Sequence, residues 1–177
     1  MNKLGIRKKI LNQRKKKYFK NFDDSKIYNF LKKYKKYKIG GYFPINYELD
    51  CLKILKKLSK QNFQISLPIM KKNNQMDFFS WDFNQPLTIN DFGIPEPTSS
   101  KIIYPDIILV PTVGFDKNLY RLGYGGGYYD RYITRIKKIK NIITIGISFS
   151  FQKIDKLPIN KFDQRLDAII TERNIFQ

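Results

Sequence analysis

Four of the ten glycines in this chain lie within one short stretch, RLGYGGGYYDR, from Arg121 to Arg131. Elsewhere glycine is rare, and the chain has 26 isoleucines but two valines and one alanine, a skew typical of an AT-rich coding sequence. Glycines kept together against that drift indicate a backbone requirement, either a positive φ or the close approach of another group. The apolar run 102–115 precedes the cluster and a helix-compatible run follows it. A glycine loop between a strand and a helix N-terminus can cradle phosphate with its backbone N–H groups.

Composition sets the class of protein. A length of 177 residues suits a single domain, residues 1–177, and 42% hydrophobic with 15% aromatic residues is too rich for a disordered chain. No apolar run is long enough to cross a bilayer, and the basic N-terminus lacks the apolar core of a secretion signal. Cys51 is the only cysteine, so no intrachain disulfide can form. We expect a cytoplasmic protein without a membrane partner, and a monomer.

The chain has no histidine, which excludes histidine-based triads, histidine general bases and histidine metal sites. A single cysteine cannot supply a soft zinc site. Carboxylates, lysine, arginine, tyrosine and backbone amides remain, and this set suits phosphate, Mg²⁺ and polyanionic ligands.

The formal net charge is +19, and fifteen Lys or Arg residues fall within residues 1–38 against only Asp23 and Asp24. One interpretation is a nucleic-acid-binding arm. The interpretation we favour is that lysine codons fill solvated helix faces. A third, compatible with the second, is a positive field that concentrates an anionic substrate.

Hydrophobic spacing predicts four helices. Residues 2–20 form a basic amphipathic pattern with heptad-spaced Leu4, Leu11 and Tyr18. Residues 24–36 follow the i, i+3, i+4, i+7 pattern after a cap at Asp23 or Asp24. Asn46 is expected to cap a third helix, and a fourth follows the glycine loop over about residues 127–138. The third helix carries its apolar face at Leu49, Leu52, Leu55 and Leu58.

Between the helices lie short apolar runs that read as strands, at residues 39–43, 63–70, 106–110, 141–148 and 166–171. MDFFSW reads as another strand at an edge, and DFGIPEP, residues 91–97, as a rigid loop. Strands alternating with helices predict an α/β domain with a mainly parallel sheet. Ligands of such sheets bind beyond the carboxyl ends of the strands, where the glycine loop falls.

Several charged residues are candidates for phosphate or metal chemistry. Arg121 could hold phosphate bidentately beside the loop amides, or form only a surface ion pair. Asp130, in the first turn of the following helix, interacts favourably with the positive end of the helix dipole and could also coordinate Mg²⁺. Asp167 enters a buried strand and needs a partner, either a shared metal or an arginine, with Asp163 and Arg165 as nearby alternatives.

Other candidates come from the first half of the chain. Lys3 and Arg7 share one helix face, which is either solvated or a clamp for a triphosphate. Glu48 could hydrogen-bond a polar heterocycle if it lies near the glycine loop. Three loop tyrosines either stack on a planar ligand or pack into the core: Tyr124, Tyr128 and Tyr129.

Whole segments of the chain also resemble the 5-formyltetrahydrofolate cyclo-ligase family. KLGIRKKILNQR is similar to the family's N-terminal basic helix, and YFPINYELDCLKIL, LPIM, MDFFSW and GIPEP follow in the expected order. The most specific match is PDIILVPTVGFDKNLYRLGYGGGYYDRYI, and KFDQRLDAIITE is similar to the family's closing strand. The resemblance covers nearly the whole chain. The chain departs from the usual pattern at Leu119, Thr112 and Phe162, which replace a frequent Gly, Gly and His.

The resemblance implies a three-layer α/β/α sandwich that converts 5-formyltetrahydrofolate to 5,10-methenyltetrahydrofolate with MgATP, releasing ADP and phosphate. In the family's accepted route the formyl oxygen is phosphorylated before the nitrogen at position ten attacks. A basic nucleic-acid-binding module and a folate-binding protein with little turnover are the alternatives.

Carried over by position, the resemblance also implies roles for individual residues. Asp130 and Asp167 would hold Mg²⁺, and the catalytic residues would be Arg121, Tyr124 and Asp130. The folate site would comprise Phe43, Glu48, Tyr124, Gly125, Gly126, Gly127 and Tyr128. ATP would contact Lys3, Leu4, Gly5, Ile6, Arg7, Arg121, Leu122, Gly123, Tyr124, Gly125, Gly126, Gly127, Tyr128 and Tyr129.

Overall fold

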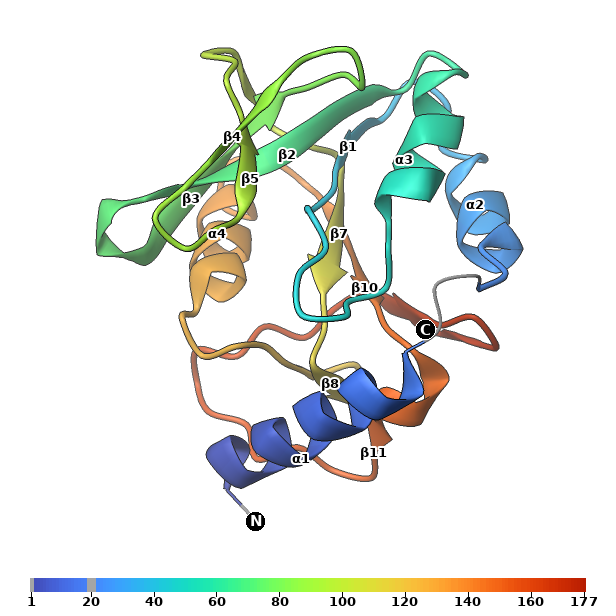
Figure 1. Cartoon of the computed structure of the whole chain (residues 1–177), viewed down its shortest axis with the longest axis vertical. Helices are drawn as coiled ribbons and strands as arrows, with labels where there is room; N and C mark the ends of the chain where they lie inside the picture. The colour runs from blue at the N-terminus through green and yellow to red at the C-terminus, as the bar shows by residue number, and fades with distance from the viewer. Residues whose placement is uncertain (1, 19–21) are drawn as a thin grey trace.

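A computed structural model describes residues 2–18 and 22–177 as one mixed sheet covered by helices on both faces (Figure 1). The parallel centre of the sheet runs from β12 to β2, and antiparallel strands extend it at both edges. The spatial order is β13 (Ile175–Phe176), β12 (Ala168–Ile170), β10 (Ile143–Ile147), β7 (Ile107–Pro111), β1 (Lys38–Gly40), β2 (Gln64–Lys71), β3 (Gln75–Ser80) and β6 (Ile102–Ile103). The predicted α/β class and mainly parallel sheet are confirmed.

The three layers follow from how the central strands alternate. In β7, Ile107 and Leu109 belong to the core with α2 (Ser25–Leu31) and α3 (Leu52–Ser59). Ile108 and Val110 point to the other face and pack with α4 (Tyr128–Ile136). Because both faces of β7 are covered, its sequence is a continuous apolar run, as expected for a parallel strand.

Two small sheets lie outside these layers. β4 (Leu87–Ile89) pairs with β5 (Pro95–Pro97) in a hairpin, so the GIPEP segment expected to be a rigid loop is partly a strand. The other sheet is built from three very short strands that the hydrophobic pattern did not predict: β8 (Gly114–Asp116), β9 (Arg121–Leu122) and β11 (Lys153–Ile154). Short 3₁₀ turns span Lys72–Asn74 and Ser150–Gln152. β3 is not at the sheet edge, since β6 covers it.

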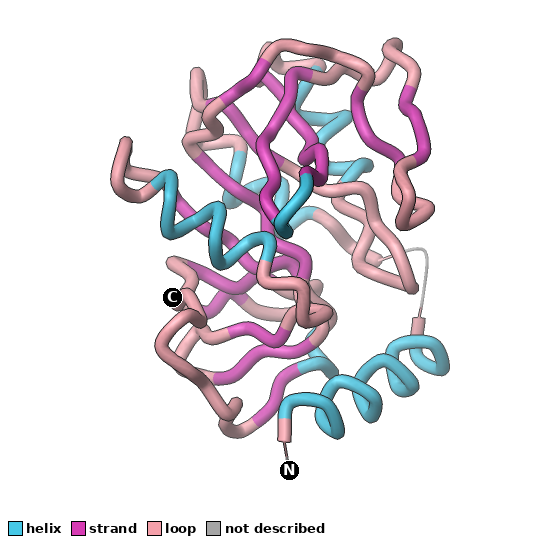
Figure 2. The backbone as a smooth tube through the Cα atoms, turned by 90° about the vertical axis from the view of Figure 1, so that its left-hand side faces the viewer, coloured by secondary structure: helices cyan, strands magenta, loops and turns pink. Residues whose placement is uncertain are grey.

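The first helix, α1 (Lys3–Lys17), lies across the end of the molecule, beside β8 and away from α2 and α3 (Figures 1 and 2). Of the predicted heptad positions, Leu4 is wrong, since it is 69% exposed, whereas Leu11 and Tyr18 are partly buried and pack against the core. The buried face consists of Ile6, Ile10 and Arg14, spaced by four residues. Ile6 and Ile10 pack on apolar side chains near the small sheet, and this contact sets the rotation of the helix.

The third predicted helix begins later than expected. Asn46 and Tyr47 have φ of +48° and +62°, which ends any helical pattern there, and α3 starts only at Leu52. Leu49 is nevertheless buried, packed in the core from an irregular segment. Residues 41–51 therefore form a loop at the carboxyl end of β1. No helix in the described ranges is long and apolar enough to span a membrane.

Close packing around β1 predicts a strong effect of one added methyl group. A Cβ at residue 40 would lie 2.6 Å from the Phe78 ring and 2.8 Å from Pro105 Cγ. Gly40→Ala should therefore destabilise the fold by about 1–3 kcal/mol, measured by urea unfolding. Gly123→Ala is the matched control, because a Cβ there meets nothing within 4 Å. Equal stability of the two variants would contradict this account.

Candidate active site

A cavity of about 1120 Å³ opens at the carboxyl ends of the parallel strands, where the glycine loop was expected. Tyr42 and Phe43 reach it from the loop after β1, and Pro111 from the end of β7. The glycine loop, the start of α4 and the N-terminal turn of α1 form one wall, and the β4–β5 hairpin contributes to the opposite side. Segments far apart in sequence thus meet at a single site.

The backbone of the glycine loop explains why glycines are needed. Gly125 has φ +110° and Gly127 has φ +68°, and Gly127 is the N-cap of α4. A Cβ at Gly126 would approach the Tyr128 ring to 2.9 Å. The predicted backbone requirement is therefore confirmed at these three positions. The loop delivers the N-terminus of α4, with its unpaired N–H groups, to the cavity.

Cations from α1 line the same wall. Lys3 and Arg7, which share one helix face, both border the cavity. Arg7 Nε donates to the Gly123 carbonyl at 2.8 Å, and Lys3 Nζ pairs with Asp163 at 2.5 Å. Of the intervening predicted ATP contacts, Leu4 is exposed, Ile6 packs in the core, and neither these nor Gly5 lines the cavity.

Arg121 and Asp130 form an ion pair at the junction of the loop and α4. The Arg121 Nη2 to Asp130 Oδ1 distance is 2.9 Å, and the arginine side chain is only 4% exposed. Arg121 also donates to the Gln164 carbonyl at 3.2 Å, while Asp130 Oδ1 accepts from the Gln164 N–H at 3.0 Å. The pair is thus a partly buried element of the cavity wall rather than a surface contact.

Asp167 lies elsewhere. It precedes β12, at the amino end of a parallel strand, whereas the cavity lies at the carboxyl ends. Its Oδ2 accepts from the backbone N–H and the hydroxyl of Thr144, at 2.7 and 2.6 Å. The structure therefore does not bring Asp167 to the cavity beside Asp130, with which it was expected to hold Mg²⁺. Across residues 2–18 and 22–177, no group of three or more Asp, Glu, Cys or His residues could hold a metal by itself.

Glu48 is buried in the cavity wall with a relative exposure of 4%. Its Oε2 accepts from the Ile45 N–H at 2.9 Å, while Oε1 has no hydrogen-bond partner among the described residues. Burial raises the pKa of this carboxyl to about 7, against the opposing effects of the Ile45 N–H, the Arg14 charge and the Tyr124 hydroxyl. Glu48 is therefore placed to accept a hydrogen bond from a ligand.

The raised pKa of Glu48 predicts a pH dependence of stability. An acid whose pKa is higher in the folded state stabilises the fold below its unfolded pKa of 4.5, and this stabilisation is lost as pH rises towards about 7. The glutamine of Glu48→Gln cannot ionise, so this variant should not lose stability as the pH rises. The difference in free energy of unfolding between the variant and the wild type should therefore increase by about 2–3 kcal/mol from pH 5 to pH 8, in favour of the variant. Urea unfolding of both proteins across this range measures the difference. Parallel pH curves would refute the prediction.

Tyr124 lies in the glycine loop and interacts with both Arg14 and Glu48. Its hydroxyl accepts a hydrogen bond from Arg14 Nη2, and its ring lies 5.7 Å from the Arg14 guanidinium. Burial, together with the Glu48 charge, raises the pKa of its hydroxyl to about 12. Arg14 was missed from sequence, although it is one of only two arginines in a helix otherwise filled with lysine.

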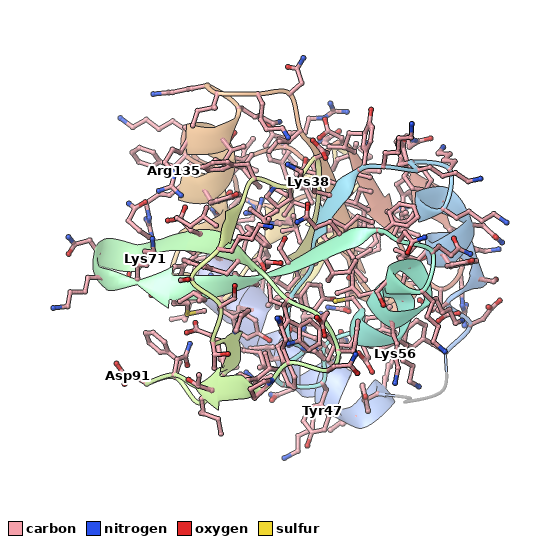
Figure 3. All side chains as sticks on the ribbon, turned by 90° about the horizontal axis from the view of Figure 1, so that it is seen from above. Lys38, Tyr47, Lys56, Lys71, Asp91 and Arg135 are labelled. Atoms are coloured by element: carbon pink, nitrogen blue, oxygen red, sulfur yellow. The ribbon has the colours of Figure 1, made fainter. Side chains whose placement is uncertain are left out.

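The rest of the cavity lining is both apolar and cationic. Phe43, expected in the folate site, lines the cavity together with apolar residues that were not singled out from sequence: Pro68, Met70, Met76, Phe92, Ile94 and Pro95. Arg131, Arg135 and Lys138 add positive charge from α4. Arg135 and Lys71, labelled in Figure 3, both pair with Asp77. The cavity lining therefore offers apolar side chains that suit a planar group and cations that suit anions.

The fold and the sequence both match known proteins. The 5-formyltetrahydrofolate cyclo-ligase of Haemophilus influenzae is 31% identical over 139 residues, covering 75% of this chain and 74% of that protein. The Mycoplasma pneumoniae 5,10-methenyltetrahydrofolate synthetase structure superposes with a TM-score of 0.77 at 28% identity, covering 97% of this chain and 99% of that one. The Aquifex aeolicus 5,10-methenyltetrahydrofolate synthetase also gives 0.77, at 30% identity, covering 99% and 92%.

The family model described as "5-formyltetrahydrofolate cyclo-ligase family" matches residues 2–172. This range includes α1, the loop after β1, the glycine loop and α4, which together build the cavity. The sequence match thus extends over every wall of the site, and the chain belongs to the 5-formyltetrahydrofolate cyclo-ligase family of ligases.

Proposed function

We propose that this protein catalyses the ATP-dependent cyclisation of 5-formyltetrahydrofolate to 5,10-methenyltetrahydrofolate, with release of ADP and phosphate. The observation that carries the proposal is the composition of the cavity beside the glycine loop. Its glycine loop and cationic α1 wall suit a triphosphate, while its apolar wall with Glu48 suits a flat heterocycle. Both ligands would then meet at Tyr124.

The chemistry requires no histidine. The formyl oxygen attacks the γ-phosphorus, the bond to ADP breaks, and a phosphorylated formyl group forms. The nitrogen at position ten then attacks the formyl carbon and loses its proton, and the carbon–oxygen bond breaks as phosphate leaves. Phosphoryl transfer depends mainly on alignment and charge neutralisation, which loop amides and arginines can supply.

Individual residues have distinct parts in this proposal. Arg7 and Arg121 balance charge on the phosphates, and the amides at the start of α4 bind the terminal phosphoryl oxygens. Lys3 contributes once its ion pair with Asp163 opens. Phe43 packs against the heterocycle, and the unpaired Glu48 Oε1 accepts a hydrogen bond from it.

The donor set also fits one Mg²⁺ ion. Mg²⁺ in nucleotide sites is commonly held by one or two carboxylates together with phosphate oxygens and water, so a full protein cage is unnecessary. Asp130 is the carboxylate of the glycine-loop wall that would hold it. Bound there, the ion would neutralise charge on the β- and γ-phosphates. Asp167 is not part of this proposal because its carboxylate contacts Thr144 outside the cavity.

The test is direct. Purified protein with MgATP and 5-formyltetrahydrofolate should form the methenyl product, followed by its absorbance, with one ADP released per product. Omitting ATP or adding a chelator in excess should stop the reaction. Tight folate binding without product would refute the activity and leave a folate-binding protein.

A further inference from the structure

Arg14 is the largest fully buried side chain among the described residues, with a relative exposure of 0%. No ion pair joins it to a carboxylate in that part of the chain. Nη1 reaches the Thr112 carbonyl at 3.4 Å, and Nε is buried without a hydrogen-bond partner. Burying a guanidinium with so few partners is costly, so packing alone does not explain this residue.

The main contact of Arg14 is with the cavity. It donates to the Tyr124 hydroxyl and also lies against the Tyr124 ring, so it fixes both the position and the orientation of this side chain. Tyr124 is the residue at which the two proposed ligands meet. Arg14 itself does not line the cavity, and therefore acts on the site through Tyr124.

Arg14 also acts on Glu48 through its charge. Glu48 carries the other buried polar atom of this region without a partner. Against the effect of burial, Arg14 of α1 and Tyr124 of the glycine loop both lower the pKa of Glu48. Besides burial, the Glu48 charge in turn raises the pKa of neighbouring groups in its own loop and in α4: Tyr42, Cys51 and Tyr129. Arg14 is the cation closest in effect, since it is the charge that favours the ionised form of Glu48.

We propose that Arg14 is a positioning residue for the reaction, holding the Tyr124 phenol between the two ligands, with its charge acting on the Glu48 carboxyl. This inference rests on the proposed function. Arginine suits the role because its charge is permanent and its planar fork can donate to Tyr124 and Thr112 at once. Arg14 is one of only seven arginines among the 34 basic residues of the chain.

A kinetic cycle tests the action through Tyr124. Arg14→Met should lower kcat roughly 10- to 100-fold, the range for loss of a charge-assisted hydrogen bond, while the KM for ATP stays within about threefold. Loosening of α1, which also carries Lys3 and Arg7, would instead raise that KM. Arg14→Lys should recover part of kcat. Adding Arg14→Met to Tyr124→Phe should slow the enzyme by no more than about twofold, because both changes remove one contact.

Arg173→Met is the matched control, since Arg173 is exposed at the other end of the chain. It should behave as wild type. If Arg14→Met keeps kcat within about twofold, or if its effect multiplies with that of Tyr124→Phe, the inference is wrong. Should Arg14→Met fail to fold, Arg14→Lys takes its place in the cycle. Full activity of Arg14→Lys would then contradict the claim that the planar guanidinium of Arg14 positions Tyr124.

The second readout does not depend on turnover. The chain has only three glutamates, Glu48, Glu96 and Glu172, so selective ¹³Cδ labelling gives three signals, assigned with Glu48→Gln. The Glu48 signal should titrate near pH 7 in the wild type and at a higher pH, by about half a unit or more, in Arg14→Met. Arg14→Lys should stay near the wild-type midpoint.

The two readouts separate the two claims. An active wild type with an unchanged Glu48 midpoint in Arg14→Met overturns the inference and leaves the proposed function standing. An inactive wild type in which the midpoint still rises refutes the proposed function and supports the electrostatic effect of Arg14 on Glu48.

Discussion

Arg121→Ala is expected to reduce methenyl formation about a hundredfold or more while the protein remains folded. The guanidinium is almost fully enclosed at the cavity wall and is held by Asp130 and the Gln164 carbonyl. A preorganised donor in an enclosed site needs no rearrangement when charge develops on the transferring phosphoryl group, and losing such a donor commonly reduces turnover by two to three orders of magnitude. The change also leaves Asp130 without its cation.

The matched variants separate charge from shape. Arg121→Lys keeps the positive charge but has no planar fork, so it should fall between the wild type and Arg121→Ala. Arg165→Ala removes an exposed arginine whose Nε donates to the Asn118 carbonyl outside the cavity, and it should keep wild-type turnover. Steady-state rates at saturating ATP and folate, with thermal melts of each variant, give the comparison. A folded Arg121→Ala protein with near-wild-type kcat would remove Arg121 from the mechanism.

The main elements of the fold could be predicted because their signals are local. The parallel strands at the centre of the sheet are apolar runs rich in isoleucine, and α4 begins directly after the glycine loop. The small sheet was missed because its strands are two or three residues long and carry no usable periodicity. Leu49 misled the helix prediction because the core buries it from an irregular segment, where leucine spacing resembles a helix face.

Leu119, one of the three departures from the family pattern, lies in a turn with an unusual backbone conformation. Leu119 has φ +66°, a conformation that glycine adopts far more easily, and it stands where many family members have glycine. Its side chain is 2% exposed and packs in the core on the α4 face of the sheet. Burial of the leucine side chain offsets the backbone strain, so the turn is retained.

The site was only partly accessible from sequence. Helical spacing alone put Lys3 and Arg7 on one face, and Glu48 was a candidate from its position at a strand-to-helix junction. The family resemblance supplied Phe43 and assigned Glu48 to the folate site. Arg14 was hidden because a buried arginine within a lysine run looks like one more solvated charge. Asp167 was misplaced because the family resemblance assigned it to the metal, although its position at the start of β12 puts it at the amino end of a parallel strand, away from the ligand-binding end.

Gly125→Ala is expected to lower kcat/KM for ATP roughly 5- to 100-fold, whereas Gly123→Ala should stay within about twofold of the wild type. Gly125 has φ +110°, and holding a non-glycine residue in so sparse a region costs about 1–3 kcal/mol. A methyl group at position 125 would lie 3.5 Å from Arg7 Nη2, an ordinary contact, so the effect arises from the backbone rather than from a clash.

The comparison isolates the orientation of the loop amides. Relaxing φ at residue 125 turns the adjacent peptide groups away from the N-terminus of α4, so the triphosphate loses aligned N–H donors and its KM rises. Gly123 has no positive φ and open space around it, so alanine there leaves the peptide groups in place. Steady-state kinetics with ATP and folate varied separately should show that the KM for ATP rises more than the KM for folate. If Gly125→Ala has a lower melting temperature but unchanged KM values for ATP and folate, the loop bears the strain without moving. Its glycines would then serve folding rather than phosphate binding.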